Sequence, residues 1–598
     1  MNTYAVDFET YYDKECSIRT LGPLGYFSHP AFDAYLVSVV GDDGTKFVGH
    51  PKDFVWEQLN GQRVLSHNAS FDETLFLYGV SQNWWGDCDP AEWHCTADLA
   101  AYCRLPRSLK GSTAEMFDLT VDKSTRDNMS GKRWEKMTPE FKEEVCEYAI
   151  KDSELCLRLW ESLKDRWPQF ERDISRVNRT IVQRGIPIDT ELLKKQLEII
   201  NQKLFEAEQD IPWLDDKPLL SKAAFDQQCL LLGIDPPASL AESDEDAQKW
   251  IAKHSEEHKW IGAVKSWRRI NSIKKKLESF DYATMPDGRY YGGCMYFGAH
   301  TGRFSGSGGN LNLQNLPRDE MFGVNLRHLI CPEPDKKLIV VDLSQIEVRT
   351  LCWLAKDREM MEEIRNTDDI YEAFAIRFNM WDKKDGVLKK EDVNKRYAVK
   401  TMVLGCGYGA GAKRFASMSN ISEKEAQKRV DTYRNKMKKI KNLWHEYNED
   451  IAGSNQACKG GRDIEGKEIF TNFTVELPSK RVLDYGVLGK HGEGATTQFT
   501  AKVPRHGRSA TVRLWGGLVA ENASQALARD IFSDMLLRVE EAGHKVIMHV
   551  HDELVVEAKA DEAEETLSDV IKIMSQPPTW IPDIPVEAEG AIQTRYEK

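Results

Sequence analysis

A short aliphatic run in the second half of the chain, Leu338-Ile339-Val340-Val341, ends at the carboxylate of Asp342. A run of this length and composition predicts a buried β-strand and is far too short to cross a bilayer. A helical pattern resumes at Glu347, so a helix follows the strand almost directly. This arrangement is common in ordinary βα turns with a capping serine, here Ser344, and it also places acids in catalytic sites. The strand therefore predicts a sheet around it and makes Asp342 a candidate catalytic residue.

Two further strands are predicted near the end of the chain, over 545–550 and 554–557. His551-Asp552-Glu553 lies between them, as in a tight hairpin. A carboxylate at a hairpin tip can approach Asp342 and share metal ions with it. A surface hairpin would show much the same pattern, so this string gains its meaning from the others.

Between these strands lies a helical segment with a four-residue period. Arg396, Lys400, Leu404 and Tyr408 follow this period, so they are expected on one helix face. Two cations one turn apart suit a triphosphate, because they bind several oxygens and offset charge on a leaving pyrophosphate. An exposed basic helix face is the alternative reading of this segment taken alone.

The beginning of the chain carries a second acidic pattern. The segment 4–10 reads as a strand in which Asp7 and Glu9 point one way while Val6 and Phe8 point to the core. Two neighbouring carboxylates repel each other, and a divalent cation such as Mg²⁺ or Mn²⁺ relieves that repulsion. An edge strand with a polar face would look similar.

Two later positions strengthen this pattern. Asp72 follows the apolar run Val64-Leu65 and the string that begins at Asn68. The segment 140–163 reads as an amphipathic helix, and in it Tyr148 and Asp152 are four residues apart on one face.

Composition limits the classes that remain. The 598 residues suggest about four domains at roughly 150 residues each, and none of the 12 cysteines forms a C-x-x-C pair, which argues against a zinc ribbon and a disulfide framework. The net charge of −14 speaks against a nucleic-acid partner only on average, because a local basic segment such as 265–276 sets phosphate binding. The first residues lack a signal peptide. We expect a protein without a membrane partner, in the cytoplasm, or in the host cytoplasm if the chain is viral.

The order D-x-E, N-x-x-x-D, Y-x-x-x-D over the first 165 residues resembles the DnaQ-like (DEDDy) 3′→5′ exonucleases. This resemblance implies that Asp7, Glu9, Asp72 and Asp152 hold two metal ions and that Tyr148 orients the attacking water. Because every acid of the motifs is present, an active nuclease is expected.

The later strings resemble the bacterial polymerase I type, family A of the DNA polymerases. Residues 340–349 resemble its motif A, 395–409 its motif B and 549–554 its motif C. The strings 301–305, 312–317 and 326–332 stand before motif A in the family order, and 521–530 looks like the form found in bacteriophage members.

The two resemblances imply a multidomain α/β and α+β chain: an RNase H-like exonuclease domain followed by a right-hand polymerase. The expected domains are the exonuclease (1–168), the thumb (169–285), the palm (286–355 and 516–598) and, between the palm segments, helical fingers (356–515). No 5′-nuclease domain is expected upstream, and no long thumb insertion for a processivity partner.

The family resemblance also implies residue roles. Asp342 and Asp552 should bind two Mg²⁺ or Mn²⁺ ions, Lys400 is a candidate general acid toward pyrophosphate, and Glu347 should exclude a 2′-hydroxyl. The expected nucleotide-binding residues are Arg396, Lys400, Tyr408, Glu347, Gln345, Tyr371 and Leu404. The expected DNA contacts are Arg303, Gln525, His551, Asn522, Lys274 and Lys275.

Some positions depart from the family pattern. Leu404 replaces a usual aromatic ring, so sensitivity to chain-terminating nucleotides is not predicted, and Tyr371 replaces a usual His. Glu521 stands where bacterial members have Asn, so either Glu521 or Asn522 is expected to face DNA.

The expected function is template-directed DNA synthesis with proofreading, as a monomer, from a primer-template DNA and dNTPs, in phage replication with helicase or other replisome proteins as partners. Repair is the alternative role. The alternative activities are a single-subunit RNA polymerase-like enzyme, an exonuclease with a non-polymerising hand, and a non-catalytic replication protein. Glu347 and the exonuclease motifs favour DNA synthesis.

Overall fold

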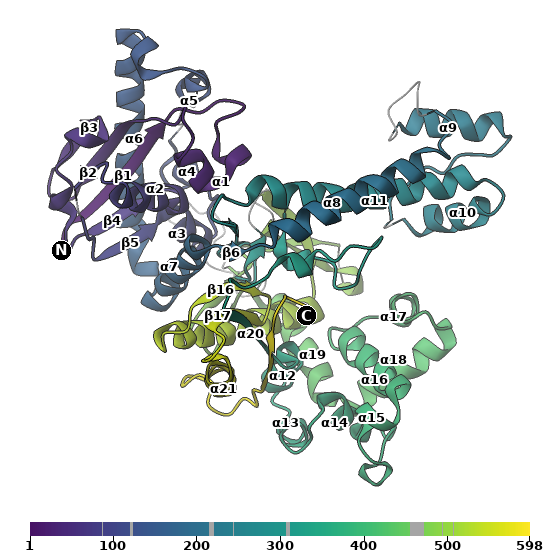
Figure 1. Cartoon of the computed structure of the whole chain (residues 1–598). Helices are drawn as coiled ribbons and strands as arrows, with labels where there is room; N and C mark the ends of the chain where they lie inside the picture. Colours follow the sequence, from purple (N-terminus) through teal and green to yellow (C-terminus); the bar gives the residue numbers. More distant parts are fainter. Residues whose placement is uncertain are drawn as a thin grey trace.

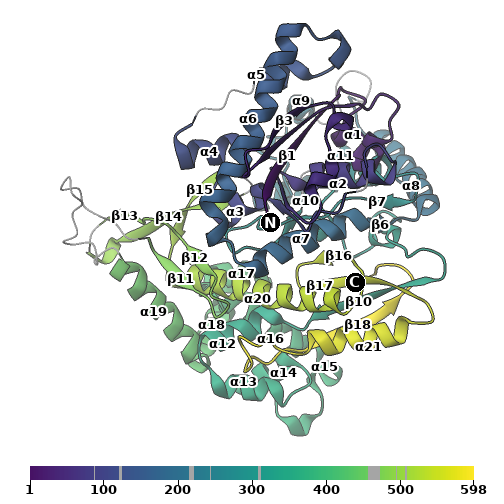
Figure 2. The same ribbon diagram turned by 90° about the vertical axis from the view of Figure 1, so that its left-hand side faces the viewer.

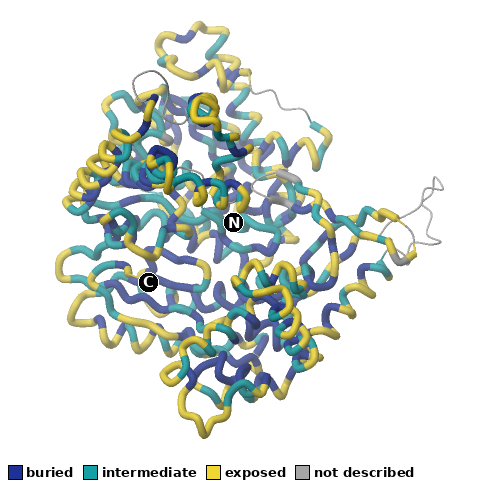
Figure 3. Tube along the Cα trace, turned by 90° about the vertical axis from the view of Figure 1, so that its right-hand side faces the viewer, coloured by how far each residue is buried: buried dark blue, intermediate teal, exposed yellow. Residues whose placement is uncertain are grey.

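The computed structural model describes residues 1–86, 88–119, 124–213, 221–242, 244–306, 311–454, 472–492, 494–505 and 508–597. Buried residues run through the body of the molecule, whereas most outer turns are exposed (Figure 3). No helix in these ranges is long and apolar enough to span a membrane.

The amino-terminal lobe is built on a five-stranded sheet with the order β3-β2-β1-β4-β5 (Figure 1). Its central strand β1 pairs antiparallel with β2 and parallel with β4. The strands are β1 (Thr3–Thr10), β2 (Ala34–Gly41), β3 (Lys46–Gly49), β4 (Arg63–Ser66) and β5 (Glu92–Cys95). The helices of this lobe are α1 (Ile18–Phe27), α2 (Ala69–Ser81), α3 (Thr96–Tyr102), α4 (Leu109–Phe117), α5 (Ser124–Met129) and α6 (Pro139–Leu163).

The alternation predicted for β1 is confirmed. Val6 and Phe8 are buried, and the Phe8 ring stacks on Trp56 and Trp85 with centroids 5.7 and 5.6 Å away. The opposite face of β1 carries Asp7 and lies under α6, because Ser38, the register partner of Asp7, donates its hydroxyl to Ala149 O of that helix at 2.8 Å. The sheet thus turns the carboxylates of β1 toward α6.

A second sheet joins two distant parts of the chain. Its order is β16-β17-β10-β18, and β10 pairs antiparallel with both neighbours. The strands are β10 (Lys336–Leu343), β16 (Val546–Val550), β17 (Glu553–Lys559) and β18 (Ala588–Gln593). The predicted strand before Asp342 and the predicted hairpin are therefore both present, and they lie in one sheet.

Both faces of β10 are covered, which explains its continuous apolar run. Ile339 and Val341 pack with α20 (Gly516–Glu541) and α21 (Ala563–Met574). Leu338 and Val340 face the other way, toward residues of α8 (Thr190–Glu208) and α11 (Lys259–Ala283).

Helices α8 and α11 form a long arm that projects from the body (Figure 1). Its tip consists of α9 (Lys222–Leu231) and α10 (Glu245–Ser255), which pack with the start of α11 around a small core of their own. In this core the Trp260 ring lies 5.5 Å from Trp213 and 5.1 Å from Phe225. Beside it, Leu230, Leu231 and Leu232 are exposed.

The segment expected to form helical fingers, 356–515, contains helices up to Ser454 and strands after residue 472. Its helices, with α12 before them, are α12 (Ile346–Leu354), α13 (Arg358–Arg365), α14 (Ile370–Arg377), α15 (Leu388–Glu391), α16 (Val393–Cys406), α17 (Ala412–Ser419), α18 (Glu423–Lys436) and α19 (Lys438–Ser454). The strands that follow are β11 (Thr474–Glu476), β12 (Val482–Asp484), β13 (Gly489–His491), β14 (Gln498–Arg505) and β15 (Arg508–Leu514). Three of these strands are three residues long, too short for a periodic signal.

The remaining elements are short, apart from α7, which connects the two halves. They are α7 (Gln169–Arg184), β6 (Ile186–Pro187), β7 (Arg289–Tyr290), β8 (Cys294–Met295) and β9 (Ser305–Gly306), with single 3₁₀ turns at 51–53, 56–59, 134–136, 164–166, 313–315, 327–329, 383–385 and 494–496.

Four buried charges join α7 to α20, which lie side by side (Figure 2). Glu171 of α7 receives two hydrogen bonds from Arg529, with Oε1–Nη1 at 2.5 Å and Oε2–Nη2 at 2.9 Å. Asp530 accepts from Arg481 Nε at 2.8 Å. All four side chains are at most 4% exposed. Two acids and two cations balance, which offsets the cost of taking each charge out of water.

We expect the variant Glu171→Gln to be destabilised by about 3 kcal/mol, because it leaves a buried guanidinium without its carboxylate partner. Thermal unfolding followed by circular dichroism should show a clear decrease in the melting temperature. Glu206→Gln is the control, because it breaks an exposed pair with Lys203 and should melt like the wild type. Equal melting temperatures for Glu171→Gln and the wild type would show that the buried pair contributes little.

Candidate active sites

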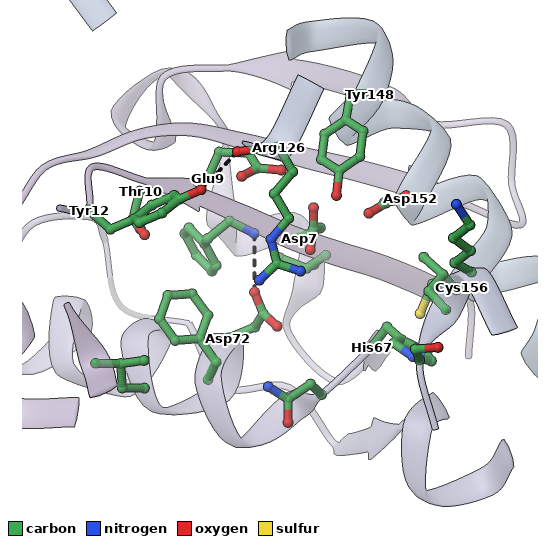
Figure 4. A pocket seen from close by; sticks show the side chains of 18 of the residues that line it. Asp7, Glu9, Thr10, Tyr12, His67, Asp72, Arg126, Tyr148, Asp152 and Cys156 are labelled. Carbon is green, nitrogen blue, oxygen red and sulfur yellow. Dashed lines mark hydrogen bonds between the residues drawn. The ribbon is translucent and has the colours of Figure 1, made fainter. Parts of the chain in front are cut away.

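The four acids predicted from the amino-terminal motifs line one cavity of about 460 Å³ (Figure 4). Strand β1 presents Asp7 and Glu9, and the first turn of α2 presents Asp72. One face of α6 presents Asp152 and Tyr148, as their four-residue spacing predicted. Three separate elements thus bring the acids together.

Burial and mutual repulsion disfavour charge on these acids. The pKa of Asp7 is well above its usual value because the group is buried and Glu9, Asp72 and Asp152 lie near it. Burial, followed by the charge of Asp152, raises the pKa of Glu9 to about 8. The pKa of Asp72 rises to about 7 through burial. Such a cluster is stabilised by cations.

Backbone geometry fixes the direction of Asp72. Asn68 precedes α2 in the left-handed region with φ of 76°. This places Asp72 so that its Oδ1 accepts a hydrogen bond from the Phe8 backbone amide at 3.1 Å. Burial and the neighbouring Asp152 raise the pKa of Tyr148, so its hydroxyl keeps its proton and can donate.

One cavity residue was missed by the sequence interpretation. Arg126 of α5 extends into the cavity, and its guanidinium points toward the carboxylates of Asp7 and Asp72 (Figure 4). Its positive charge lowers the pKa values of Asp7 and Glu9 and so partly opposes burial. A lone arginine in a six-residue helix carries no periodic or motif signal that could have identified it.

The donor set of this cavity fits Mg²⁺ or Mn²⁺, because it consists of hard carboxylate oxygens. Within the described ranges, no three acid, His or Cys side chains already surround one point closely enough to hold an ion. Asp7, Glu9, Asp72 and Asp152 are the residues that would hold such cations.

The second pair of predicted acids meets at one end of the four-stranded sheet. Asp342, near the end of β10, lies opposite Glu553 of β17. The amide of Leu343 donates to the carbonyl of Asp552 at 3.1 Å, so the backbones of the two segments touch beside both acids. The predicted convergence of Asp342 and the hairpin turn is thus present in the backbone.

The turn itself is tightly bent. His551 has φ of 57°, which folds the chain sharply between β16 and β17. Burial raises the pKa of Asp552 to about 6, and burial lowers the pKa of His551. Burial also raises the pKa of Glu553 to about 7, although the Tyr596 hydroxyl donates to Glu553 Oε1 at 2.7 Å. The carboxylate oxygens of Asp342 and Asp552 are also suitable ligands for a divalent cation.

Helix α16 carries the predicted basic residues. Arg396 is held by Asp369 through Nε–Oδ2 and Nη2–Oδ1 contacts of 2.5 and 3.1 Å. Lys400 is exposed one turn later, and Leu404, 47% exposed, follows on the next turn. The helix ends at Cys406, so Tyr408 lies just beyond it rather than on its last turn as expected.

Tyr371 is 1% exposed and lies behind the basic face. Its hydroxyl donates to Gln345 Oε1 at 3.0 Å, and the Arg396 guanidinium lies 5.1 Å from its ring centroid. Tyr371 therefore connects and orients two of the predicted nucleotide-binding residues.

Two predicted residues pair with each other. Arg303 forms an ion pair with Glu347 of α12, and His551 and Asp552 line the same small cavity as Arg303. Tyr408 is half-buried near them, and loss of solvent followed by the charge of Glu347 raises its pKa.

Helix α20 separates the two candidates for the DNA-facing position. Gln525 donates to Glu521 Oε1 at 3.4 Å, so these residues share one face, whereas Asn522 donates to the Tyr485 hydroxyl at 2.9 Å. Burial, followed by the charge of Glu347, raises the pKa of Glu521, and the charge of Arg303 lowers it, so Glu521 lies near this ion pair. On the arm, Lys275 is exposed, and Lys274 lies 3.7 Å from Glu278.

Sequence comparisons agree with these motifs. A sequence model of DNA polymerase family A matches residues 191–465. The chain is 25% identical to the DNA polymerase of Bacillus phage SP02 over 100% of both chains. It is 25% identical to the thermostable DNA polymerase I of Thermus filiformis, over 76% of this chain and 51% of the relative. It is 24% identical to DNA polymerase I of Helicobacter pylori, over 76% of this chain and 46% of the relative. The chain spans about half the length of these two bacterial relatives.

A solved structure has a similar fold. The POL domain of Pol1 from M. smegmatis, in complex with DNA primer-template and dNTP, matches with a TM-score of 0.66 and 17% identity. The match covers 100% of this chain and 95% of that one. The predicted fold class, a mixed α/β and α+β multidomain chain of this type, is confirmed.

Without divalent metal, we expect stability to decrease as the pH rises. Between an unfolded pKa of 3.8 and a folded pKa of about 7, native Asp72 retains a proton that the unfolded chain has lost. The native state therefore loses relative stability as pH increases through this window. Melting temperatures measured in a chelator should fall with pH more steeply for the wild type than for Asp72→Asn.

The exposed Asp53→Asn variant is the control for this experiment and should keep the wild-type slope. Identical slopes for Asp72→Asn and the wild type would contradict the prediction.

Proposed function

This chain belongs to DNA polymerase family A, and from that membership we propose that it extends a DNA primer on a template and also removes nucleotides from 3′ ends at a second site. The observation that carries the proposal is the presence of two separate carboxylate sites, one under α6 and one at the end of β10. Each site contains the acids that its motif requires.

We assign the exonuclease to residues 1–168, the thumb to 169–285, the palm to 286–355 with 516–598, and the fingers to 356–515. The separate amino-terminal sheet supports the first boundary, and the arm of α8 and α11 supports the second. The sheet shared by β10, β16, β17 and β18 supports a palm made of two segments.

For synthesis, the primer 3′-hydroxyl attacks the α-phosphorus of a dNTP, a new P–O bond forms, and the bond to the pyrophosphate breaks. Divalent cations held by Asp342 and Asp552 would supply charge stabilisation to the entering and leaving oxygens. Lys400 would donate a proton to the pyrophosphate, and Arg396 would bind the triphosphate after it leaves Asp369. Gln345 and Tyr371 orient this basic face.

For excision, water attacks the last phosphodiester, and the bond to the 3′-oxygen breaks. The products are a deoxynucleoside monophosphate and a DNA end with a free 3′-hydroxyl. Asp7, Glu9, Asp72 and Asp152 would hold the cations that stabilise charge on the phosphate. Tyr148 keeps its hydroxyl proton and orients the water.

The full-length similarity to the Bacillus phage SP02 polymerase favours a role in phage DNA replication, with primer-template DNA and dNTPs as substrates. An RNA polymerase-like activity is the second candidate. Glu347, which pairs with Arg303, argues against it, because its carboxylate would exclude a 2′-hydroxyl from the proposed nucleotide site. Helicase or other replisome partners, and a monomeric state, belong to the same proposal.

Single substitutions should separate the two activities. Asp552→Asn should reduce primer extension at least about 10²-fold, the usual cost of removing one electrostatic group at a transition state, and should leave trimming of single-stranded DNA intact. Asp7→Ala should do the reverse. Primer extension and oligonucleotide trimming, measured on the same protein samples with Mg²⁺, test both expectations. Loss of both activities in either variant, with normal folding, would argue against two independent sites.

Glu347→Ala should weaken discrimination against ribonucleotides by about 10- to 100-fold. The ratio of kcat/KM for dNTP and rNTP incorporation measures this effect. Glu347→Gln keeps the volume of the side chain and should retain most of the discrimination if exclusion is steric. An unchanged ratio in Glu347→Ala would remove Glu347 from sugar selection.

A further inference from the structure

Three cations line the acidic cavity in the part of the chain that the structure describes: Arg107, Lys110 and Arg126. Arg107 is committed elsewhere, because it forms an ion pair with Asp98 and donates to Tyr296 O at 2.9 Å. Lys110 lies on α4, whereas the positive charge of Arg126 lowers the pKa values of both Asp7 and Glu9. Arg126 is therefore a cavity cation whose charge acts directly on the acids of β1.

The backbone around Arg126 is anchored on both sides. Its carbonyl accepts from the Tyr12 hydroxyl at 2.8 Å, just beyond the end of β1. The preceding Thr125 donates its hydroxyl to Glu144 Oε1 of α6 at 2.6 Å, and Met129 is buried. Helix α5 is thus tied to the two elements that carry most of the acids, and Arg126 extends from it into the cavity (Figure 4).

The guanidinium of Arg126 keeps its donors available. The side chain is exposed, and it forms no ion pair with any carboxylate of the described residues, although it points toward two of them. Charge compensation of the acids alone would favour direct contact. A planar fork of N–H donors held above an acidic cluster suits a ligand that brings its own negative oxygens, such as a phosphodiester.

We propose that Arg126 is a catalytic residue of the exonuclease site that binds the non-bridging oxygens of the phosphodiester being cleaved. This inference rests on the proposed 3′→5′ exonuclease function. As water adds to phosphorus and the P–O3′ bond breaks, negative charge increases on the non-bridging oxygens. Arg126 stabilises that charge, and the 3′-oxygen takes up a proton as it leaves.

The test compares Arg126→Ala, Arg126→Lys and the wild type in trimming of a single-stranded oligonucleotide with Mn²⁺. Loss of one transition-state donor should lower kcat about 10²-fold in Arg126→Ala, and lysine should restore part of the rate as a point charge. Lys132→Ala is the matched control, because it removes a nearby cation that does not line the cavity. The Lys132 ammonium lies over the Phe141 ring instead, 4.4 Å from the ring centroid.

A second measurement distinguishes catalysis from a structural role. Mn²⁺ affinity of each protein without DNA, measured by electron paramagnetic resonance, should be unchanged or tighter in Arg126→Ala, because a repelling cation is gone. A kcat within about threefold of the wild type, or Mn²⁺ binding that weakens in parallel with the rate, would overturn the proposal.

The Asp7→Ala variant separates this inference from the function on which it rests. If Asp7→Ala abolishes trimming while Arg126→Ala does not affect it, only the role of Arg126 is wrong. If the wild type itself trims no DNA, the proposed exonuclease function fails, and the role of Arg126 fails with it.

Discussion

The buried charges between α7 and α20 fix the position of the two halves of the chain relative to each other. Glu171 belongs to the segment that follows the amino-terminal lobe, whereas Arg529 and Asp530 lie 358 and more residues later, on the helix that covers β10. Arg481 ties the small strands after α19 to the same point. Charges in such surroundings must be paired with good geometry. Their pairing therefore fixes how the acidic cavity under α6 sits relative to the end of the four-stranded sheet.

Each site brings carboxylates together although burial and repulsion disfavour their charges. Packing of apolar residues in the fold offsets this cost. In the first site, the Phe8 ring stacks on Trp56 and Trp85 and so fixes the position of β1. The position of β1 in turn determines where Asp7 and Glu9 lie. In the second, apolar burial on both faces of β10 fixes Asp342 beside the hairpin turn. Hydrophobic packing thus keeps these acids in place despite the cost of their charges, and bound cations would reduce that cost.

Local pattern was enough for residues whose neighbours along the chain determine their direction. The alternation in β1 predicted that Asp7 and Glu9 share a face, and the helical spacing predicted the same for Tyr148 and Asp152. Local pattern was not enough where the partner is distant in sequence. The residues around Glu171 give no indication that Glu171 pairs with Arg529. Arg126 was missed because a short helix has no period, and β11, β12 and β13 were missed because three residues cannot show alternation. Nor could spacing tell that Asn522 turns to Tyr485 while Glu521 stays with Gln525.

The small core at the tip of the arm bears on how such a chain can change during evolution. Trp213, Phe225 and Trp260 pack among themselves and with α10, in a cluster distinct from the one that α8 and α11 share with the sheet. Insertions, deletions or exchange of this compact unit leave the packing around both acidic sites untouched. The tip is therefore a unit whose own packing does not depend on either acidic site.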